Sequence, residues 1–387
     1  MPDDTVSKPT LPPDTLDLTT ELVPAVRGLL ARGLSDSFLR ACVRIGEFET
    51  YSGGLKADLV GGLTLHVNAA IKLGGAELVI HASLMNAVNA RRPGTFAEVL
   101  ETVPLNGSRW LLLMAQLRKY ETLFDLVFDR ETTLAALKQA LDKTFAGLAS
   151  VHAIVSGTIP ELGAFVETQD PYTSRVRSKL TATLKGDPAL APMLDTPGQV
   201  MGRACPPLGD LITRLETWLA RAMPDVPRVL IHGDPHLRNV MVRHYGKGLA
   251  ARFIDPNPDY GYTDPAYDFG KLLHFAEPVG WAVARPAVCR GSWCQGSGDW
   301  TLDAKLLAAP QAPERRRAFL EQEIHARIAR LRWARDPTWA ARLHVARASA
   351  HLGLLARFSG QGTDDARRFV LAHAVAALAA WDAQIAR

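Results

Sequence analysis

The chain has 387 residues, which is enough for two or three domains of ordinary size, and it is 47% hydrophobic and 22% charged. This composition excludes a collagen-like, disordered or coiled-coil chain. The formal net charge of +4 is too small and too dispersed along the chain to indicate nucleic acid binding by itself.

Cysteine usage and the two ends of the chain point to a cytoplasmic location. The four cysteines form neither a disulfide framework nor a zinc-binding pattern, so we expect free thiols in a reducing compartment. The first residues are acidic and proline-rich, unlike a signal peptide. The longest apolar run, residues 369–381, is too short to cross a bilayer. We therefore expect no membrane partner.

The N-terminal part has the texture of a small β-rich lobe. Residues 1–20 lack periodicity and are expected to be a flexible leader. A lobe over residues 21–117 is then predicted from its pattern of glycines and apolar residues. Its expected elements are helices at 21–39 and 76–90 and strands at 58–60, 63–72 and 110–117.

From residue 118 to residue 387 helical patterns dominate. Three short apolar stretches, each followed by polar residues, interrupt them as strands, and residues 156–200 read as long loops with a short helix. A β-rich part followed by a larger helical part predicts an α+β protein of two lobes with a cleft. The expected helices are 132–153 and 208–223, and residues 314–347 and 364–386 are expected to form a helical tail. The expected strands are 229–231, 240–242 and 251–254.

Residues 225–276 carry the chemistry. Asp234 follows one apolar strand, Asn239 precedes a second, and Asp255 ends a third. An aspartate carboxylate and an asparagine oxygen are hard oxygen ligands of the kind that Mg²⁺ prefers. A second carboxylate nearby can accept the proton of an attacking hydroxyl, which is the set of groups that phosphoryl transfer requires.

This segment resembles the catalytic segment of the aminoglycoside phosphotransferase and choline kinase-like family, small-molecule kinases with a protein-kinase-like fold. The motif His-Gly-Asp-x-x-x-x-Asn reads here from His232 to Asn239, and the Ile-Asp motif reads Ile254-Asp255. The resemblance implies that Asp234 is the catalytic base, that Asn239 and Asp255 hold Mg²⁺, and that ATP is the phosphoryl donor. We expect His232 to brace the loop.

The letters Asp268-Phe269-Gly270 spell the metal-binding motif of protein kinases, but they begin 29 residues after Asn239 and lead into an apolar helix. We therefore assign the metal role to Asp255 and expect Asp268 to tie the following helix to the catalytic loop.

The N-terminal half resembles the same family more loosely. Gly53 and Gly54 are similar to its nucleotide-covering hairpin, although an ordinary hairpin turn explains them equally well. Lys72 stands where the resemblance implies a phosphate-binding lysine, with Lys56 as a competitor.

Two further nucleotide contacts are implied by the same resemblance. Glu77 is the one acidic residue that could hold Lys72 from the next helix, or it simply favours the start of that helix. The family's glutamate often lies deeper in the helix, where this chain has His81. The segment from Met114 to Leu117 resembles the hinge whose backbone meets adenine, while a core strand is the alternative.

The acceptor is a small molecule with a hydroxyl group, according to the resemblance. Residues 300–345 carry an excess of arginine and lysine over acidic residues, whereas a pocket for a polycationic aminoglycoside should be acidic. A sugar, an amino alcohol or a related metabolite fits better. The alternative for the arginines is a solvated helix face, and the four tryptophans of this region, which could stack on a sugar ring, have core packing as their alternative. The open alternatives are a nucleotide-binding pseudokinase or regulatory module and, more distantly, a nucleic-acid-binding protein.

Overall fold

The structure is a computed structural model, and the chain divides into two compact units. Residues 1–83 and 97–116 form the first unit, and residues 84–96 and 117–387 form the second. The expected leader and the expected helix at 21–39 lie outside the described residues. Those are residues 43–51, 54–61, 69–104, 110–115, 117, 119–154, 171–245, 248–257, 260–307, 310–358 and 363–386.

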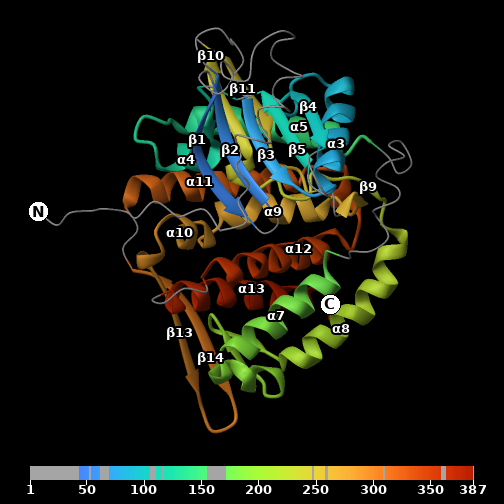
Figure 1. The fold of residues 1–387 in the computed structure, drawn as a ribbon. Coiled ribbons are helices and arrows are strands. Elements are labelled where there is room, and N and C mark those ends of the chain that lie inside the picture. The colour runs from blue at the N-terminus through green and yellow to red at the C-terminus, as the bar shows by residue number, and fades with distance from the viewer. Residues whose placement is uncertain are drawn as a thin grey trace, which may run out of the picture. The chain divides into compact units, whose positions relative to one another are not determined.

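The first unit is a five-stranded antiparallel sheet in the order β1-β2-β3-β5-β4, with helix α3 (Glu77–Arg91) starting in it (Figure 1). Leu112, Leu113 and Met114 of β5 are all buried, so this strand is covered on both faces. Residues 69–72 of the strand predicted at 63–72 belong to β3, and residues 63–68 lie outside the described residues. The strands are β1 (Val43–Tyr51), β2 (Gly54–Gly61), β3 (Ala69–Gly74), β4 (Val99–Pro104) and β5 (Trp110–Ala115).

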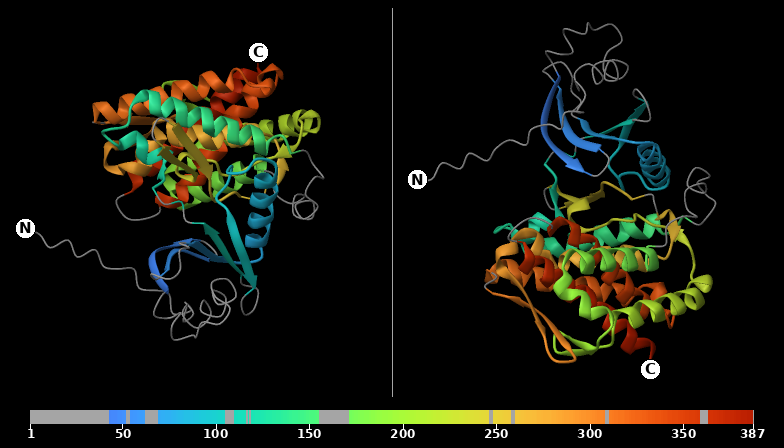
Figure 2. Two further views of the ribbon diagram at one scale, coloured as in Figure 1. Left: turned by 90° about the horizontal axis from the view of Figure 1, so that it is seen from above. Right: turned by 60° about the horizontal axis from the view of Figure 1, so that its bottom comes forward.

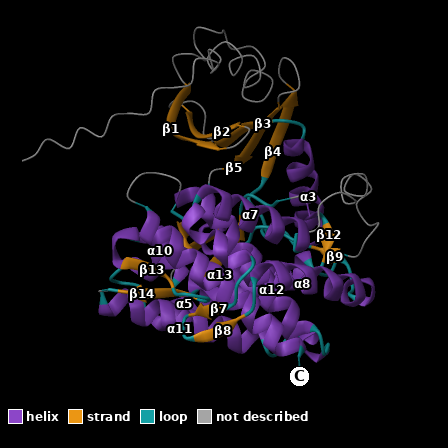
Figure 3. Ribbon diagram, turned by 90° about the horizontal axis from the view of Figure 1, so that it is seen from below, coloured by secondary structure: helices purple, strands orange, loops and turns teal. Residues whose placement is uncertain are grey.

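The second unit is mainly helical, as the purple ribbons of its labelled helices show in Figure 3. Its core lies where α9, α12 and α13 pack together. The apolar run at 369–381 belongs to α13 and is largely buried there. The helices are α4 (Leu123–Phe128), α5 (Leu134–Val151), α7 (Thr173–Gly186), α8 (Leu208–Ala222), α9 (Ala266–Ala276), α10 (Val279–Ala284), α11 (Gln311–Ile328), α12 (Trp339–Leu354) and α13 (Asp364–Ile385).

Three small sheets accompany these helices. The strands predicted around the catalytic motif lie in a three-stranded sheet, in the order β11-β10-β6, and in the two-stranded sheet β12-β9. A four-stranded sheet, β13-β14-β7-β8, was not predicted, and its long hairpin lies against α13 (Figure 2). The strands are β6 (Glu121–Thr122), β7 (Gly198–Val200), β8 (Arg203–Cys205), β9 (Val229–Leu230), β10 (Val240–Tyr245), β11 (Gly248–Phe253), β12 (Tyr262–Thr263), β13 (Cys289–Gln295) and β14 (Trp300–Leu306).

The α+β prediction is therefore confirmed, and so are most of the predicted helices. The helical tail predicted over residues 314–347 is divided: α11 ends at Ile328, a short 3-10 turn follows at Arg332–Arg335, and α12 then begins at Trp339. The described cysteines, Cys205, Cys289 and Cys294, are free thiols as predicted. Among the described residues, no helix combines the length and the apolar character that a membrane crossing requires.

Candidate active site

The catalytic segment is a loop held between short strands of the second unit. Val229, Leu230 and Ile231 are buried, and the Ile231 N–H donates to the Gly261 carbonyl over 3.0 Å. The chain then turns through the 3-10 segment Leu237–Asn239 into β10, which pairs with β11. Apolar strands thus fix both ends of a polar loop, as the sequence predicts.

Gly233 allows the loop to turn sharply. Its φ is +80°, a left-handed value, and a Cβ built there would lie 2.3 Å from the Asn257 carbonyl oxygen. The Asn257 N–H donates to the His232 carbonyl over 2.7 Å, so the segment after β11 packs directly on the loop. No other residue type fits this approach without moving the backbone.

Asp268 ties α9 to this loop, as predicted. Its carboxylate accepts the backbone N–H groups of His232 and Gly233 at 2.9 and 2.8 Å, and the carboxylate also meets His152 Nε2 at 2.9 Å. The side chain is fully buried. Its oxygens are engaged by the fold, which agrees with placing the metal role elsewhere. The neighbouring glycine, Gly270, lets α9 approach Ala346 of α12 closely.

Asp234 projects from the loop beside a lysine that the sequence analysis missed. Lys271 Nζ lies 2.9 Å from Asp234 Oδ1, and His236 Nε2 lies 3.7 Å from Oδ2. Burial would raise the pKa of Asp234, but the Lys271 ammonium outweighs it and holds that pKa well below its usual range. Lys271 could have been found from its spacing, because it lies three residues after Asp268 on the same helix face.

The two histidines of the loop are neutral braces. Burial lowers the pKa of His232, although Asp268, Asp234 and Asp255 oppose this shift, and the ring stacks on Phe96 with centroids 5.4 Å apart. Its Nδ1 accepts the Asp234 N–H over 3.2 Å, which confirms that it supports the loop. Burial likewise lowers the pKa of His236 to about 4.

Asn239 and Asp255 stand at neighbouring strand ends. Asn239 Nδ2 donates to the Asp234 carbonyl over 2.9 Å, which leaves the amide oxygen to serve as a ligand. The Ile254 N–H donates to the Asn239 carbonyl over 3.1 Å and so brings Asp255 alongside. Asp255 has a φ of +52°, a strained value of the kind that occurs at functional sites. The amide and carboxylate oxygens fit Mg²⁺.

In the first unit, Lys72 lies on β3 with only 6% of its surface exposed. Its Nζ lies 3.4 Å from Nδ1 of His81, one turn into α3. Glu77 follows the alternative of favouring the start of its own helix, because its carboxylate accepts the Gly75 N–H over 2.8 Å. His81 thus occupies the place beside Lys72 that the resemblance gave to a glutamate.

The remaining nucleotide predictions are only partly described. Gly53 lies outside the described residues, while Gly54 begins β2 opposite Tyr51, as a hairpin requires. Met114 is a buried residue of β5, paired with Ala70 of β3, and Leu117 follows the strand half-buried. A core strand is thus present, and contact of Met114 or Leu117 with adenine stays a prediction.

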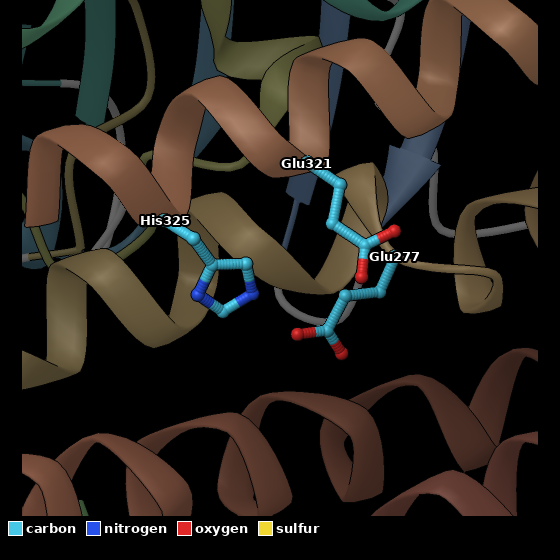
Figure 4. A group of neighbouring side chains, drawn as sticks. All are labelled: Glu277, Glu321 and His325. Atoms are coloured by element: carbon cyan, nitrogen blue, oxygen red, sulfur yellow. The ribbon is translucent and has the colours of Figure 1, made fainter.

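A second group of possible metal ligands lies at Glu277, Glu321 and His325, where α11 passes the end of α9 (Figure 4). Both carboxylates already have cationic partners. Glu277 is paired with Arg347 at 2.6 Å and His351 at 2.9 Å, and Glu321 is paired with Arg317 at 2.6 Å. We therefore interpret this group as a buried ion-pair network.

Some of the arginines of the basic C-terminal region hold the fold together. Arg342 is 2% exposed and joins Asp264 to Asp336, while the buried Arg317 binds the Ala276 carbonyl and two glutamates. The interpretation of the arginines as a solvated helix face is therefore wrong for these residues. Trp300 and Trp339 are buried, which agrees with the alternative of core packing.

Comparison with known proteins places this geometry in a family. Residues 126–306 match the model of the phosphotransferase enzyme family. No curated protein sequence matches the chain. A candidate aminoglycoside phosphotransferase from Ralstonia eutropha JMP134 has a similar structure, with a TM-score of 0.51 and 13% identity over 94% of this chain and 98% of that one. A thermostable mutant of aminoglycoside phosphotransferase APH(4)-Ia gives a TM-score of 0.51 and 13% identity over 87% and 95%.

At these identities the structural likeness concerns the fold, whereas the family model covers the loop, both strand ends and α9. The resemblance predicted from the sequence is confirmed over residues 126–306, which match the model of the phosphotransferase enzyme family.

Proposed function

We propose that the protein is a Mg²⁺- and ATP-dependent kinase that transfers the γ-phosphoryl group to a hydroxyl of a small molecule, such as a sugar, an amino alcohol or a related metabolite. The observation that carries this proposal is the loop frame of the second unit. Asp268 holds the backbone of His232 and Gly233, and the loop presents Asp234 next to Asn239. A cytoplasmic location, expected from the sequence, belongs to the same proposal.

Each residue has a distinct role in this reaction. Asp234 orients the acceptor hydroxyl and receives its proton late in the transfer, because a carboxylate with a depressed pKa is a weak base early on. Asn239 and Asp255 hold Mg²⁺, which when bound offsets the charge of the phosphates. Lys72 neutralises the triphosphate, and Met114 and Leu117 line the place of the adenine.

One observation favours a second candidate, a nucleotide-binding module with little transfer activity. Lys72 contacts His81, and Glu77 is engaged at the start of α3. A neutral imidazole orients an ammonium less firmly than a carboxylate does. Slow ATP hydrolysis with no phosphorylated acceptor would favour this candidate.

A pair of substitutions tests the proposal. Asp234→Asn should lower ADP release with an acceptor by about 100-fold or more, because general-base assistance is lost, and should leave Mg·ATP affinity nearly unchanged. Asp255→Ala should abolish the Mg²⁺-dependent part of nucleotide binding, measured by calorimetry with and without the metal. Asp225→Asn, at an exposed carboxylate, is the control. Unchanged Mg·ATP affinity in Asp255→Ala, or an equal loss of ATP binding in Asp234→Asn, would contradict the assigned roles.

A further inference from the structure

Arg175 on α7 is a half-buried cation with no carboxylate partner among the described residues. Its Nη1 donates to the Tyr260 hydroxyl over 2.7 Å, and its Nε is buried without a hydrogen-bond partner in the described part of the chain. The guanidinium packs against Gly353 of α12, where even a methyl group would collide with Nη2. The fold therefore makes room for this side chain and leaves it without an ion pair to any of the described carboxylates.

A short path of contacts connects Arg175 to the catalytic carboxylate. The rings of Tyr260 and Tyr267 lie 4.9 Å apart, and Lys271 Nζ lies 5.9 Å from the centre of the Tyr267 ring. Lys271 in turn pairs with Asp234. Arg175 is also close enough to Asp234 to interact with it electrostatically. Lys271 thus contacts Asp234, and two tyrosines connect Lys271 to Arg175; all of these residues belong to the second unit.

None of the carboxylates around this wall forms an ion pair with Arg175 in the described part of the chain. Lys271 pairs with Asp234, Arg342 pairs with Asp264, and Asp268 accepts two backbone N–H groups and meets His152. The guanidinium of Arg175 takes no part in these pairs. A partly buried guanidinium is costly without an anion, and its planar donors match a carboxylate or a phosphate.

We propose that Arg175 binds an anionic group of the acceptor, so that the substrate is a hydroxy acid or another small hydroxyl compound bearing a carboxylate or phosphate. This inference rests on the proposed function. In the transfer, the acceptor oxygen forms a bond to the γ-phosphorus as the bond from that phosphorus to the β,γ-bridging oxygen breaks. ADP leaves, and the hydroxyl proton passes to Asp234. A polycationic acceptor would meet repulsion from Arg175 and Lys271.

The experiment compares acceptors of similar size and shape that differ in the charge of one group. Glycolate, ethylene glycol and ethanolamine form one set, and glucuronate, glucose and glucosamine form another. ADP release gives kcat/KM for each compound, and calorimetry gives its binding to the protein loaded with Mg²⁺ and a non-hydrolysable ATP analogue. In at least one set, we expect the anionic acceptor to have a kcat/KM and a binding affinity about tenfold or more above those of the other two members.

Arg175→Gln should remove this preference mainly through KM, lowering kcat/KM for the anion by about 10- to 100-fold and leaving the neutral member unchanged. Arg175→Lys should keep part of it. Arg177→Gln is the matched control, because Arg177 lies on the same helix, is exposed and pairs with Glu216.

The outcomes separate this inference from the proposed function. A kinase that binds and phosphorylates neutral or amine acceptors at least as well as their anionic counterparts overturns the inference alone, as does an Arg175→Gln enzyme that keeps the preference. If no acceptor causes ADP release, the proposed function is contradicted, and the binding comparison still decides whether Arg175 recognises an anion.

Discussion

Replacing Lys271 should damage catalysis more than it damages folding or ATP binding. The ammonium is the nearest cation to Asp234 among the described residues, at 2.9 Å, with 9% of the lysine side chain and 30% of the aspartate side chain exposed. Lys271→Met keeps the length and the apolar stem but removes the charge. The carboxylate of Asp234 then loses the contact that fixes its direction toward the acceptor.

The size of the effect follows from the geometry. A hydrogen bond to a charged group contributes about 1.5–3 kcal/mol, and water can reach the partly exposed Asp234, so the lower half of that range applies. At about 1.4 kcal/mol for each factor of ten, turnover should fall by roughly 10- to 50-fold. Lys271→Arg should restore part of it, because a cation is again available.

The loss of turnover is measured by steady-state ADP release with an acceptor that the wild-type enzyme phosphorylates. Calorimetry checks whether the affinity for Mg·ATP is unchanged. Lys138→Met, at an exposed lysine of α5, is the control. If Lys271→Met turns over at the wild-type rate, or if Lys271→Arg is as impaired as Lys271→Met while both melt like the wild type, the positioning role of Lys271 is refuted.

Two further predictions concern the fold around the site. Gly233→Ala should impair both stability and turnover, because its φ is +80° and the new Cβ would lie 2.3 Å from a carbonyl oxygen. Gly202→Ala is the control: with a φ of +74° and no atom within 4 Å, it should cost only about 1 kcal/mol of backbone strain. Equal melting temperatures of the two variants would contradict the steric argument. Burial, together with the neighbouring His351, lowers the pKa of His373 to about 3. As the pH falls, the unfolded chain therefore binds the proton first, so the stability should fall below about pH 6.5. His373→Gln should reduce the dependence of the melting temperature on pH between pH 7 and pH 4. If that dependence is unchanged in the variant, His373 is not its cause.

The sequence was most informative where local chemistry and spacing coincide. The polar residues 232–239 lie between apolar strands, and that pattern predicts the loop without knowledge of distant contacts. It was least informative where the partner lies far along the chain. Arg175 and Tyr260 are 85 positions apart, and no local pattern of either residue indicates their hydrogen bond.

Two features that the sequence did not determine have identifiable physical causes. The hairpin of β13 and β14 alternates polar, small and aromatic residues and leaves much of β13 exposed, so it lacks the apolar run by which the other strands were predicted. For Glu77 the sequence left two alternatives open, and the structure shows its carboxylate bound to the nearby Gly75 N–H at the start of its own helix. A free backbone donor at a helix start competes effectively with a more distant cation.

Helix α9 is the element that orders the catalytic loop. Asp264 precedes the helix and accepts the Ala266 N–H, Asp268 follows four residues later and holds the loop backbone, and Lys271 comes three residues after that and reaches Asp234. Spacings of four and three residues place side chains on one helix face. The two aspartates therefore fix where the loop lies, and the lysine fixes where its reactive carboxylate points. Gly270 allows α9 to pack closely on α12. A substitution in that helix contact, although distant from the acceptor, should therefore lower turnover by displacing Lys271.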